Sequence, residues 1–303
     1  MTSDTDDSLR IEGVTKRFGS FTAVSDFSMR VARGTVCGFL GQNGAGKTTT
    51  IRMVMSILYP DEGRITVLGS SRAEAVKDRL GYLPEEKGLY KKMRARELLA
   101  YFGRLKGLTR GEARQRAKSL LERYGLGEFM DSRCEALSKG MGQKVQVLGA
   151  LIHEPELVIL DEPFSGLDPV NVELMREIIL DMKRDGRTVI FSTHVMEQAE
   201  QICDSIVLIH KGVKRLDGPL AEIKTGGVRG IRLDYDGDGA LLRGIPGLAR
   251  LNDAGKSAEL FLEEGADPQA ALEYLVGRVR IRRFDLREPS LHEIFVRTVG
   301  APS

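Results

Sequence analysis

Apolar runs alternate with amphipathic stretches over the first two thirds of the chain. Residues 35–40 and 157–160 are almost wholly apolar, which is typical of strands buried on both faces of a sheet. The first run leads through a glycine-rich loop into a helix predicted over 47–58. The second is followed by a helix predicted over 169–186, behind the capping residue Asp168. This order predicts an α/β fold with a mainly parallel sheet.

The same alternation continues on both sides of that helix. A helix is predicted over 138–153, and strands over 188–191 and 206–209 flank another helix. Near the N-terminus, residues 9–14 and 22–31 predict two strands joined by a turn at 18–20, and 65–68 resumes a strand. We therefore expect an antiparallel β subdomain beside the parallel sheet.

A stretch rich in Lys, Arg, Glu, Leu and Ala runs from about residue 86 to 137. Thr109, with Glu112 three residues later, forms a capping box at the start of a helix. An apolar stripe follows at Ala113, Ala117, Leu120, Leu121 and Tyr124. We expect two or more helices here, forming a helical subdomain at about 86–140 inserted into the first domain, 1–225.

A change of pattern after Thr225, Gly226 and Gly227 predicts a linker and a second domain at 228–303. The expected elements are strand 231–235, helix 240–242, strands 248–252 and 258–262, helix 268–276, strand 279–286 and helix 291–298. That order resembles a ferredoxin-like βαββαβ unit with an extra terminal helix, a small α+β domain.

Composition limits the functions open to this chain. Its 303 residues suggest two domains. Its 45 basic and 43 acidic residues leave a net charge of +2, so no concentrated basic field predicts nucleic-acid binding. Cys37, Cys134 and Cys203 show no CxxC spacing, which favours a reducing compartment over disulfides or a metal site.

The chain carries no apolar run near the ~20 residues that span a bilayer. Residues 1–7 are acidic and polar, unlike a signal peptide. We therefore expect a cytoplasmic protein that reaches a membrane only through another chain.

A phosphate-binding loop is the clearest chemical motif. Residues 41–48 fit G-x-x-x-x-G-K-[ST] completely. They follow a buried strand and begin a helix, as the motif requires, so a glycine turn that matches by chance is a poor explanation. Its amides surround phosphates, Lys47 reaches the β and γ phosphates, and Thr48 holds Mg²⁺. The predicted nucleotide-binding residues here are Gly41, Gln42, Asn43, Gly44, Ala45, Gly46, Lys47, Thr48 and Thr49.

Two carboxylates, Asp161 and Glu162, end the apolar run 157–160. The carboxyl end of a parallel strand faces the ligand crevice, so Asp161 is a candidate Mg²⁺ ligand and Glu162 a candidate general base. An apolar strand followed by Asp-Glu is common on its own. The phosphate loop makes the functional interpretation the better one.

The segment 137–144 resembles the signature motif of ATP-binding cassette (ABC) proteins, LSGGQ followed by a basic residue. Ser138 and Gly140 match, whereas Lys139 and Met141 depart from the pattern. The resemblance implies that Ser138, Gly140 and Gly142 contact a γ-phosphate bound by the opposite protomer. Taken alone, the segment would more simply be a helix cap.

Other family elements follow in the family's order. Phe18 matches the aromatic that stacks on adenine, and residues 165–168 match the D-loop. His194 matches the switch histidine that contacts the γ-phosphate, although a lone histidine at a strand end is more often structural. Glu85 stands where the family's Q-loop has a glutamine that contacts the metal. The resemblance therefore implies a metal contact for Glu85, and the alternative is that its side chain faces solvent.

These matches cover residues 9–222, and the resemblance implies the P-loop NTPase fold of an ABC cassette. It implies a subunit that binds and hydrolyses ATP with Mg²⁺ and powers a membrane transporter by ATP-driven dimer closure. The implied partners are separate transmembrane permease subunits and a second cassette, in a homodimer or a heterodimer. The subunit would lie in the cytoplasm, attached to the inner face of the membrane.

Residues 288–295 resemble the C-terminal domain of drug-, antibiotic- or sodium-efflux ABC ATPases, which favours export. The alternative is a soluble ABC ATPase of translation or DNA repair. Such proteins usually carry two cassettes or a long coiled coil, and this sequence has one cassette and no long heptad run.

Two segments have roles that the sequence leaves open. Residues 87–96 follow Glu85 and either contact the permease or form a solvated, basic helix face. Residues 228–303 either hold two protomers together or serve another purpose. The apolar residues of their last helix that would make such a contact, or pack on their own sheet, are Leu291, Ile294, Phe295 and Val299.

Overall fold

The computed structural model describes residues 7–86, 88–225, 230–263 and 265–300. They form two compact units, Met1–Gly218 and Pro219–Ser303. Most of the expected 225–227 linker lies outside the described residues.

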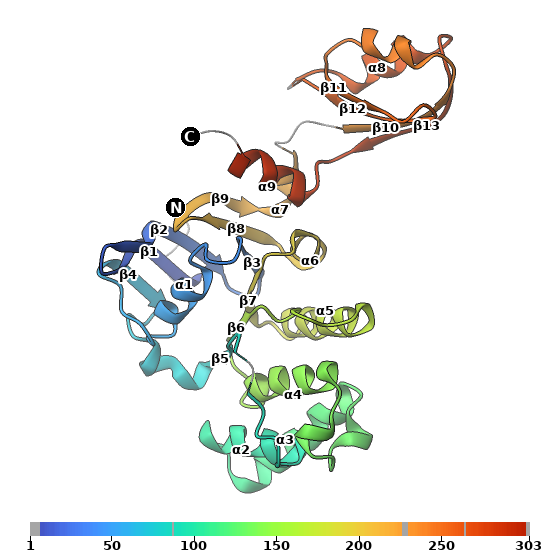
Figure 1. The fold of residues 1–303 in the computed structure, drawn as a ribbon. Coiled ribbons are helices and arrows are strands. Elements are labelled where there is room, and N and C mark those ends of the chain that lie inside the picture. The colour runs from blue at the N-terminus through green and yellow to red at the C-terminus, as the bar shows by residue number, and fades with distance from the viewer. Residues whose placement is uncertain (1–6, 87, 226–229, 264, 301–303) are drawn as a thin grey trace. The chain divides into compact units, whose positions relative to one another are not determined.

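A six-stranded sheet forms the centre of the first unit (Figure 1). Its order is β5 (Leu80–Leu83), β6 (Leu157–Asp161), β7 (Thr188–Thr193), β3 (Val36–Leu40), β8 (Ser205–His210) and β9 (Val213–Pro219). The strands from β5 to β8 pair in parallel, and every residue of β3, β6 and β7 is buried. The mainly parallel sheet is thus confirmed, and the carboxyl ends of β3, β6 and β7 meet at one edge.

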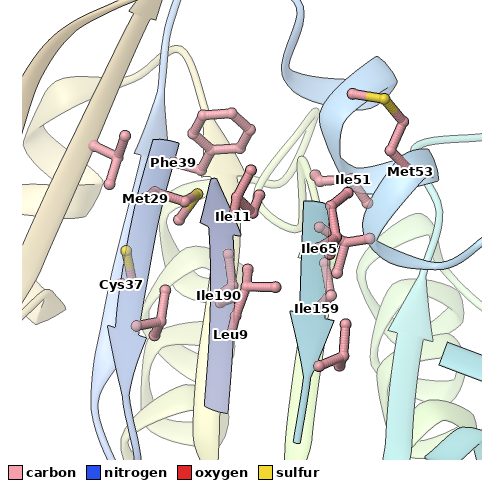
Figure 2. Packing of buried hydrophobic residues seen from close by; sticks show 14 of the residues in the cluster. Leu9, Ile11, Met29, Cys37, Phe39, Ile51, Met53, Ile65, Ile159 and Ile190 are labelled. Carbon is pink, nitrogen blue, oxygen red and sulfur yellow. The ribbon is translucent and has the colours of Figure 1, made fainter. Parts of the chain in front are cut away.

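An antiparallel sheet in the order β2-β1-β4 lies beside it. These strands are β1 (Asp7–Phe18), β2 (Phe21–Ala32) and β4 (Glu62–Val67). Figure 2 shows Leu9, Ile11 and Ile65 from this sheet gathered with Ile159 and Ile190 from the parallel sheet in one buried cluster. Alternating apolar positions along β1 and β2 supply this face, so burial of apolar surface joins the two sheets.

The helix after the phosphate loop, α1 (Lys47–Val54), is shorter than predicted. Ser56 adopts a left-handed backbone with φ of 54°, and the amides of Ile57 and Leu58 both bond back to the carbonyl of Arg52. These bonds close the helix end before residue 58. The apolar residues that suggested a longer helix belong to the turn that follows.

Helices α2 (Ala95–Leu105), α3 (Arg110–Arg123) and α4 (Lys139–Leu151) follow β5. Thr109 and Glu112 form the expected capping box of α3. Ala113, Ala117 and Leu121 are buried in the contact with α2. These positions of the predicted apolar stripe therefore form the interface between α3 and α2.

The remaining helices of the first unit are α5 (Pro169–Arg184), capped by Asp168 as predicted, and α6 (Met196–Ile202). Short 3-10 turns lie at Ala73–Arg79, Gly127–Phe129 and Cys134–Ala136. Within the described residues, no helix is long and apolar enough to cross a membrane.

The second unit contains a four-stranded sheet in the order β11-β12-β10-β13, with antiparallel pairing throughout. Its elements are α7 (Leu220–Thr225), β10 (Gly230–Asp236), β11 (Leu248–Asp253), β12 (Ser257–Leu262), α8 (Pro268–Leu275), β13 (Arg280–Arg287) and α9 (Leu291–Gly300). This matches the expected ferredoxin-like order, except that the first helix is a 3-10 turn, Gly239–Gly244. Leu233, Tyr235 and Leu260 lie in a core of its own.

Candidate functional site

The phosphate loop connects β3 to α1 at the edge where the parallel strands end. Gly46 has φ of 109°, and a side chain there would begin 2.8 Å from the carbonyl of Ala23. A side chain on Gly41 would begin 2.5 Å from the carbonyl of Ile209. The motif's glycines are thus required by close backbone contacts on both sides of the loop.

The buried Lys47 side chain contacts this loop and the end of β6. Its Nζ donates to the carbonyl oxygens of Gly41 at 2.7 Å and Gln42 at 3.3 Å, and lies 3.5 Å from Glu162 Oε1. The Lys47 side chain is only 6% exposed. The chain's own oxygens therefore hold the ammonium at the end of β6, within the loop that would receive phosphate.

Glu162 follows β6 directly and has a left-handed backbone with φ of 50°, rare for a residue with a side chain. Its amide donates to Ser192 Oγ at 3.0 Å, and its carboxylate accepts from His194 Nδ1 at 3.0 and 3.1 Å. The structure therefore brings Lys47, Glu162 and His194 together from the ends of three neighbouring strands. The resemblance gave His194 a γ-phosphate contact, and here its imidazole lies against Glu162.

Asp161 is completely buried beside this cluster. Ser192 Oγ donates to its Oδ1, and its Oδ2 is buried with no hydrogen-bond partner among the described residues. Burial raises the pKa of Asp161, the hydroxyls of Ser192 and Thr48 oppose this rise, and the charges of Glu85 and Glu162 add to it. The Thr48 hydroxyl is within 3.5 Å of Glu85 Oε2.

Oxygen donors from Thr48, Asp161 and Glu85 thus converge on one spot, and one of their oxygens is buried and unpartnered. Mg²⁺ is commonly held by one or two carboxylates together with water and phosphate oxygens. The residues present fit such an ion. Among the described residues, no set of three or more His, Cys, Asp or Glu side chains could hold a metal by itself.

The signature segment lies at the start of α4. Ser138 caps this helix, its Oγ accepting from the Met141 amide at 3.2 Å. A side chain on Gly140 would begin 2.3 Å from the side chain of Asn171 in α5. The Lys139 ammonium lies 2.1 Å from the point where a side chain on Gly166 would begin. Residues 138–142 therefore pack against residues 165–171, forming a second group of the expected site residues.

Phe18 lies at the end of β1, directly opposite Phe21 of β2. Phe18 is 48% exposed and Phe21 is 64% exposed, so neither ring belongs to a core. The Nζ of Lys16 lies over the Phe18 ring, 5.6 Å from its centroid.

Sequence reasoning missed Ser192, whose hydroxyl bonds to both Asp161 and the Glu162 amide. The parallel register places Asp161 beside Ser192 on neighbouring strands. A polar residue at the end of the apolar run 188–191, two positions before His194, is the signal that could have found it.

A cavity of 490 Å³ opens beside the segment that carries Glu85. Glu86 and Gly88 lie at its wall. Its other lining residues include Tyr82, Leu83, Phe102, Leu105, Lys106 and His153. A largely apolar groove therefore lies between β5 and the helices α2 and α4, next to the segment that carries Glu85.

Comparison with known proteins gives matches in both units. Residues 24–165 match the sequence family described as ABC transporter, and residues 218–299 match the family described as ATP-binding protein DrrA1-3-like, C-terminal domain. The chain is 40% identical to YhaQ of Bacillus subtilis (strain 168), described as an uncharacterized ABC transporter ATP-binding protein, over 97% of this chain and 99% of that protein.

Two further similarities agree with these. The chain is 35% identical to Nod factor export ATP-binding protein I of Rhizobium sp. (strain N33), over 96% of each chain. A solved structure described as the ATP binding subunit of an ABC transporter is 32% identical, with a TM-score of 0.65 over 72% of this chain and 92% of that one. YhaQ and the Nod factor export protein match along nearly the whole chain, so their similarity includes both units.

Proposed function

Because this chain belongs to the ABC transporter family of ATP-binding proteins, it is an ATPase that powers a membrane transporter, and we propose that it drives export. The direction is supported by the Nod factor export relative and by the second unit's match to a DrrA1-3-like C-terminal domain. A soluble ATPase of translation or DNA repair finds no support among the relatives described above.

The meeting of Lys47, Glu162 and His194 within 3.0–3.5 Å is the observation that carries the chemical part of this proposal. When ATP enters, Lys47 exchanges the carbonyls of Gly41 and Gln42 for the β and γ phosphates. Glu162 then accepts a proton from the water that attacks the γ-phosphate, and His194 contacts that phosphate and keeps the Glu162 carboxylate in place.

We propose that Thr48, Asp161 and Glu85 hold Mg²⁺ beside the phosphates. When bound, the ion neutralises negative charge on the β and γ phosphates. The support is the unpartnered, buried Oδ2 of Asp161 and the neighbouring oxygens of Thr48 and Glu85. These residues bind and orient, whereas the proton moves only to Glu162.

The start of α4 is assigned to a second cassette's ATP. Ser138, Gly140 and Gly142 stand at a helix N-terminus, where a hydroxyl and backbone amides favour an anion. In this proposal two copies, or this chain and a related ATPase, enclose two ATP molecules. The Phe18 ring stacks on the adenine of the ATP that its own chain binds.

We assign the permease to the 490 Å³ groove beside Pro84, Glu86 and Gly88. The groove is lined by Tyr82, Leu83, Phe102 and Leu105, and Pro84 and Glu86, on either side of Glu85 in the chain, also line it. An apolar helix of a membrane subunit would bury these side chains and sense any movement of Glu85. The chain would then lie in the cytoplasm, attached to the inner face of the membrane through that subunit.

Co-purification with a membrane protein from a neighbouring reading frame tests the proposal. We expect Leu105→Arg, at an exposed groove position, to abolish co-purification and the stimulation of ATPase activity by the membrane protein, because it places a charge in an apolar contact. The basal ATPase activity of the isolated chain should not change. Leu286→Arg in the second unit is the matched control, and equal retention of the membrane protein by both variants would refute the groove assignment.

A further inference from the structure

The segment between α1 and β4, together with the start of β4, lies against β1. We call residues 59–63, which include the first two residues of β4, the α1–β4 turn. Gly63 has φ of 82°, and a side chain there would begin 2.4 Å from the carbonyl oxygen of Gly13 and 2.5 Å from that of Glu12. Only glycine permits this approach, so the contact of the turn with β1 requires glycine at position 63.

Asp61 is the centre of the contacts that the turn makes. Its amide donates to the carbonyl of Thr15 at 2.9 Å, and its Oδ2 accepts from the amide of Arg17 at 2.6 Å. Its Oδ1 accepts from Lys16 Nζ at 3.0 Å. Next to it, Glu62 pairs with the Arg17 guanidinium at 2.7 Å. The turn therefore binds the backbone and side chains of the residues that precede Phe18.

The β ladder alone does not fix this part of β1. Its register against β2 shifts between Val14 and Lys16 and again between Lys16 and Arg17. Against β4, the register shifts between Glu12 and Thr15. Irregular pairing allows the strand end to bend and twist, so the contacts of Asp61 provide the constraint that regular pairing would otherwise give.

Lys16 extends this constraint to the Phe18 ring. Its ammonium is held by Asp61 and lies over the ring, 5.6 Å from the centroid. A cation over one face is attracted by the ring and shields that face. About half of Phe18 is exposed, which leaves ring surface for a flat partner.

We infer that the α1–β4 turn braces Phe18 for stacking on the nucleotide base, with Asp61 as a positioning residue and Lys16 as the support behind the ring. This rests on the proposed role of Phe18. Asp61 touches neither base nor phosphate in this account. It should therefore affect the part of the binding free energy that depends on the base and leave the part that depends on the phosphates unchanged.

Calorimetric titration of the full chain with MgATP, and with Mg²⁺ plus inorganic tripolyphosphate as a ligand without a base, separates these two parts. We expect Asp61→Ala to weaken ATP binding about threefold to tenfold, the effect of losing a small group of hydrogen bonds, with tripolyphosphate affinity unchanged. Asp61→Asn keeps an oxygen for the Arg17 amide and should lose less.

Two further variants complete the design. Phe18→Ala should weaken ATP binding by itself, and adding Asp61→Ala to it should weaken binding no further, because the two residues act through one contact. Glu12→Gln is the matched control, since Glu12 also joins β1 to β4, by an ion pair with Arg64, but lies away from Phe18. It should bind both ligands as the wild type does.

Several results would overturn the inference. Equal losses for ATP and tripolyphosphate, unchanged ATP affinity in Asp61→Ala, or additive losses in the double variant would each show that Asp61 does not act through the base. If Asp61→Ala does not fold, the same comparison in Asp61→Asn decides. Loss of ATP affinity in Phe18→Ala but not in the Asp61 variants removes only the brace, whereas no loss in Phe18→Ala removes the stacking role as well.

Discussion

At the scale of single residues, the left-handed backbone of Glu162 explains how two adjacent carboxylates serve one site. In a regular strand, consecutive side chains point to opposite faces of the sheet. Asp161 lies with Ser192 and near Thr48, while Glu162 turns to Lys47 and His194. The φ of 50° at Glu162 breaks the alternation, so both carboxylates face the phosphate loop. Backbone strain of this kind is concentrated at functional sites.

Glu85 provides a test of the metal assignment. Burial is the main cause of the raised pKa of Asp161, and the charge of Glu85 adds to it, because the two carboxylates repel each other when no cation separates them. The ratio of the ATP dissociation constant in EDTA to that in Mg²⁺ should therefore fall about fivefold in Glu85→Gln, since one like charge is removed from the site.

The matched control for this measurement is Glu86→Gln, which removes a neighbouring, exposed carboxylate. Its ratio should remain that of the wild type. An unchanged ratio in Glu85→Gln would mean that Glu85 faces solvent and does not take part in the metal site.

Motif residues and their supports differ in how well the sequence predicts them. Lys47, Asp161 and Glu162 are predictable because their positions relative to strand and helix boundaries are part of the motif. The role of Ser192 depends on the parallel register of β6 and β7, which no local pattern specifies. The contact between Lys16 and Asp61 joins residues far apart in sequence through the α1–β4 turn, so only the folded structure reveals it.

At the scale of elements, the buried strands were predicted well and the helix ends less well. An all-apolar run such as β6 has few alternatives to full burial in a parallel sheet. The end of α1 depends on the conformation of Ser56, and the short helix α7 at Leu220–Thr225 was not predicted. A few local hydrogen bonds determine where a helix ends or whether a short helix forms, and these bonds cannot be inferred from the composition of the segment.

His153, next to the end of α4, makes the stability of the fold depend on pH. Its Nε2 donates to the carbonyl of Leu80 at 2.9 Å, and its Nδ1 is buried with no partner among the described residues. Burial lowers the pKa of His153 from 6.5 to about 4, against a smaller opposing effect of the Leu80 bond. The unfolded chain therefore binds a proton between these pH values, and the folded chain does not.

The contribution of neutral His153 to the free energy of unfolding is therefore fully present above about pH 6.5, and it is lost as the pH falls toward about 4. We expect the wild type to lose on the order of 1–2 kcal/mol more unfolding free energy between pH 7 and pH 5 than His153→Gln, whose amide keeps a donor but does not titrate. Urea unfolding at the two pH values measures this difference. Equal losses in both proteins would show that His153 titrates normally.

At the scale of the whole molecule, the chain divides its tasks between two units with separate cores. The first contains the phosphate loop and the residues at the ends of β3, β6 and β7. Predicting the second as a ferredoxin-like unit was possible because its strands and helices alternate in sequence. The order β11-β12-β10-β13 follows from long-range pairing, which a single sequence does not encode locally.

The central claim is that Glu162 is the general base of an ATPase that works as an ATP-closed dimer. Its most direct test is Glu162→Gln, assayed for ATP turnover and, with MgATP, by size-exclusion chromatography. We predict that turnover falls about a hundredfold or more, because an amide cannot accept the proton, while ATP binding persists and the protein elutes as a dimer. Lys47→Ala, impaired in phosphate binding, should remain a monomer under the same conditions. Turnover close to that of the wild type in Glu162→Gln would contradict the claim.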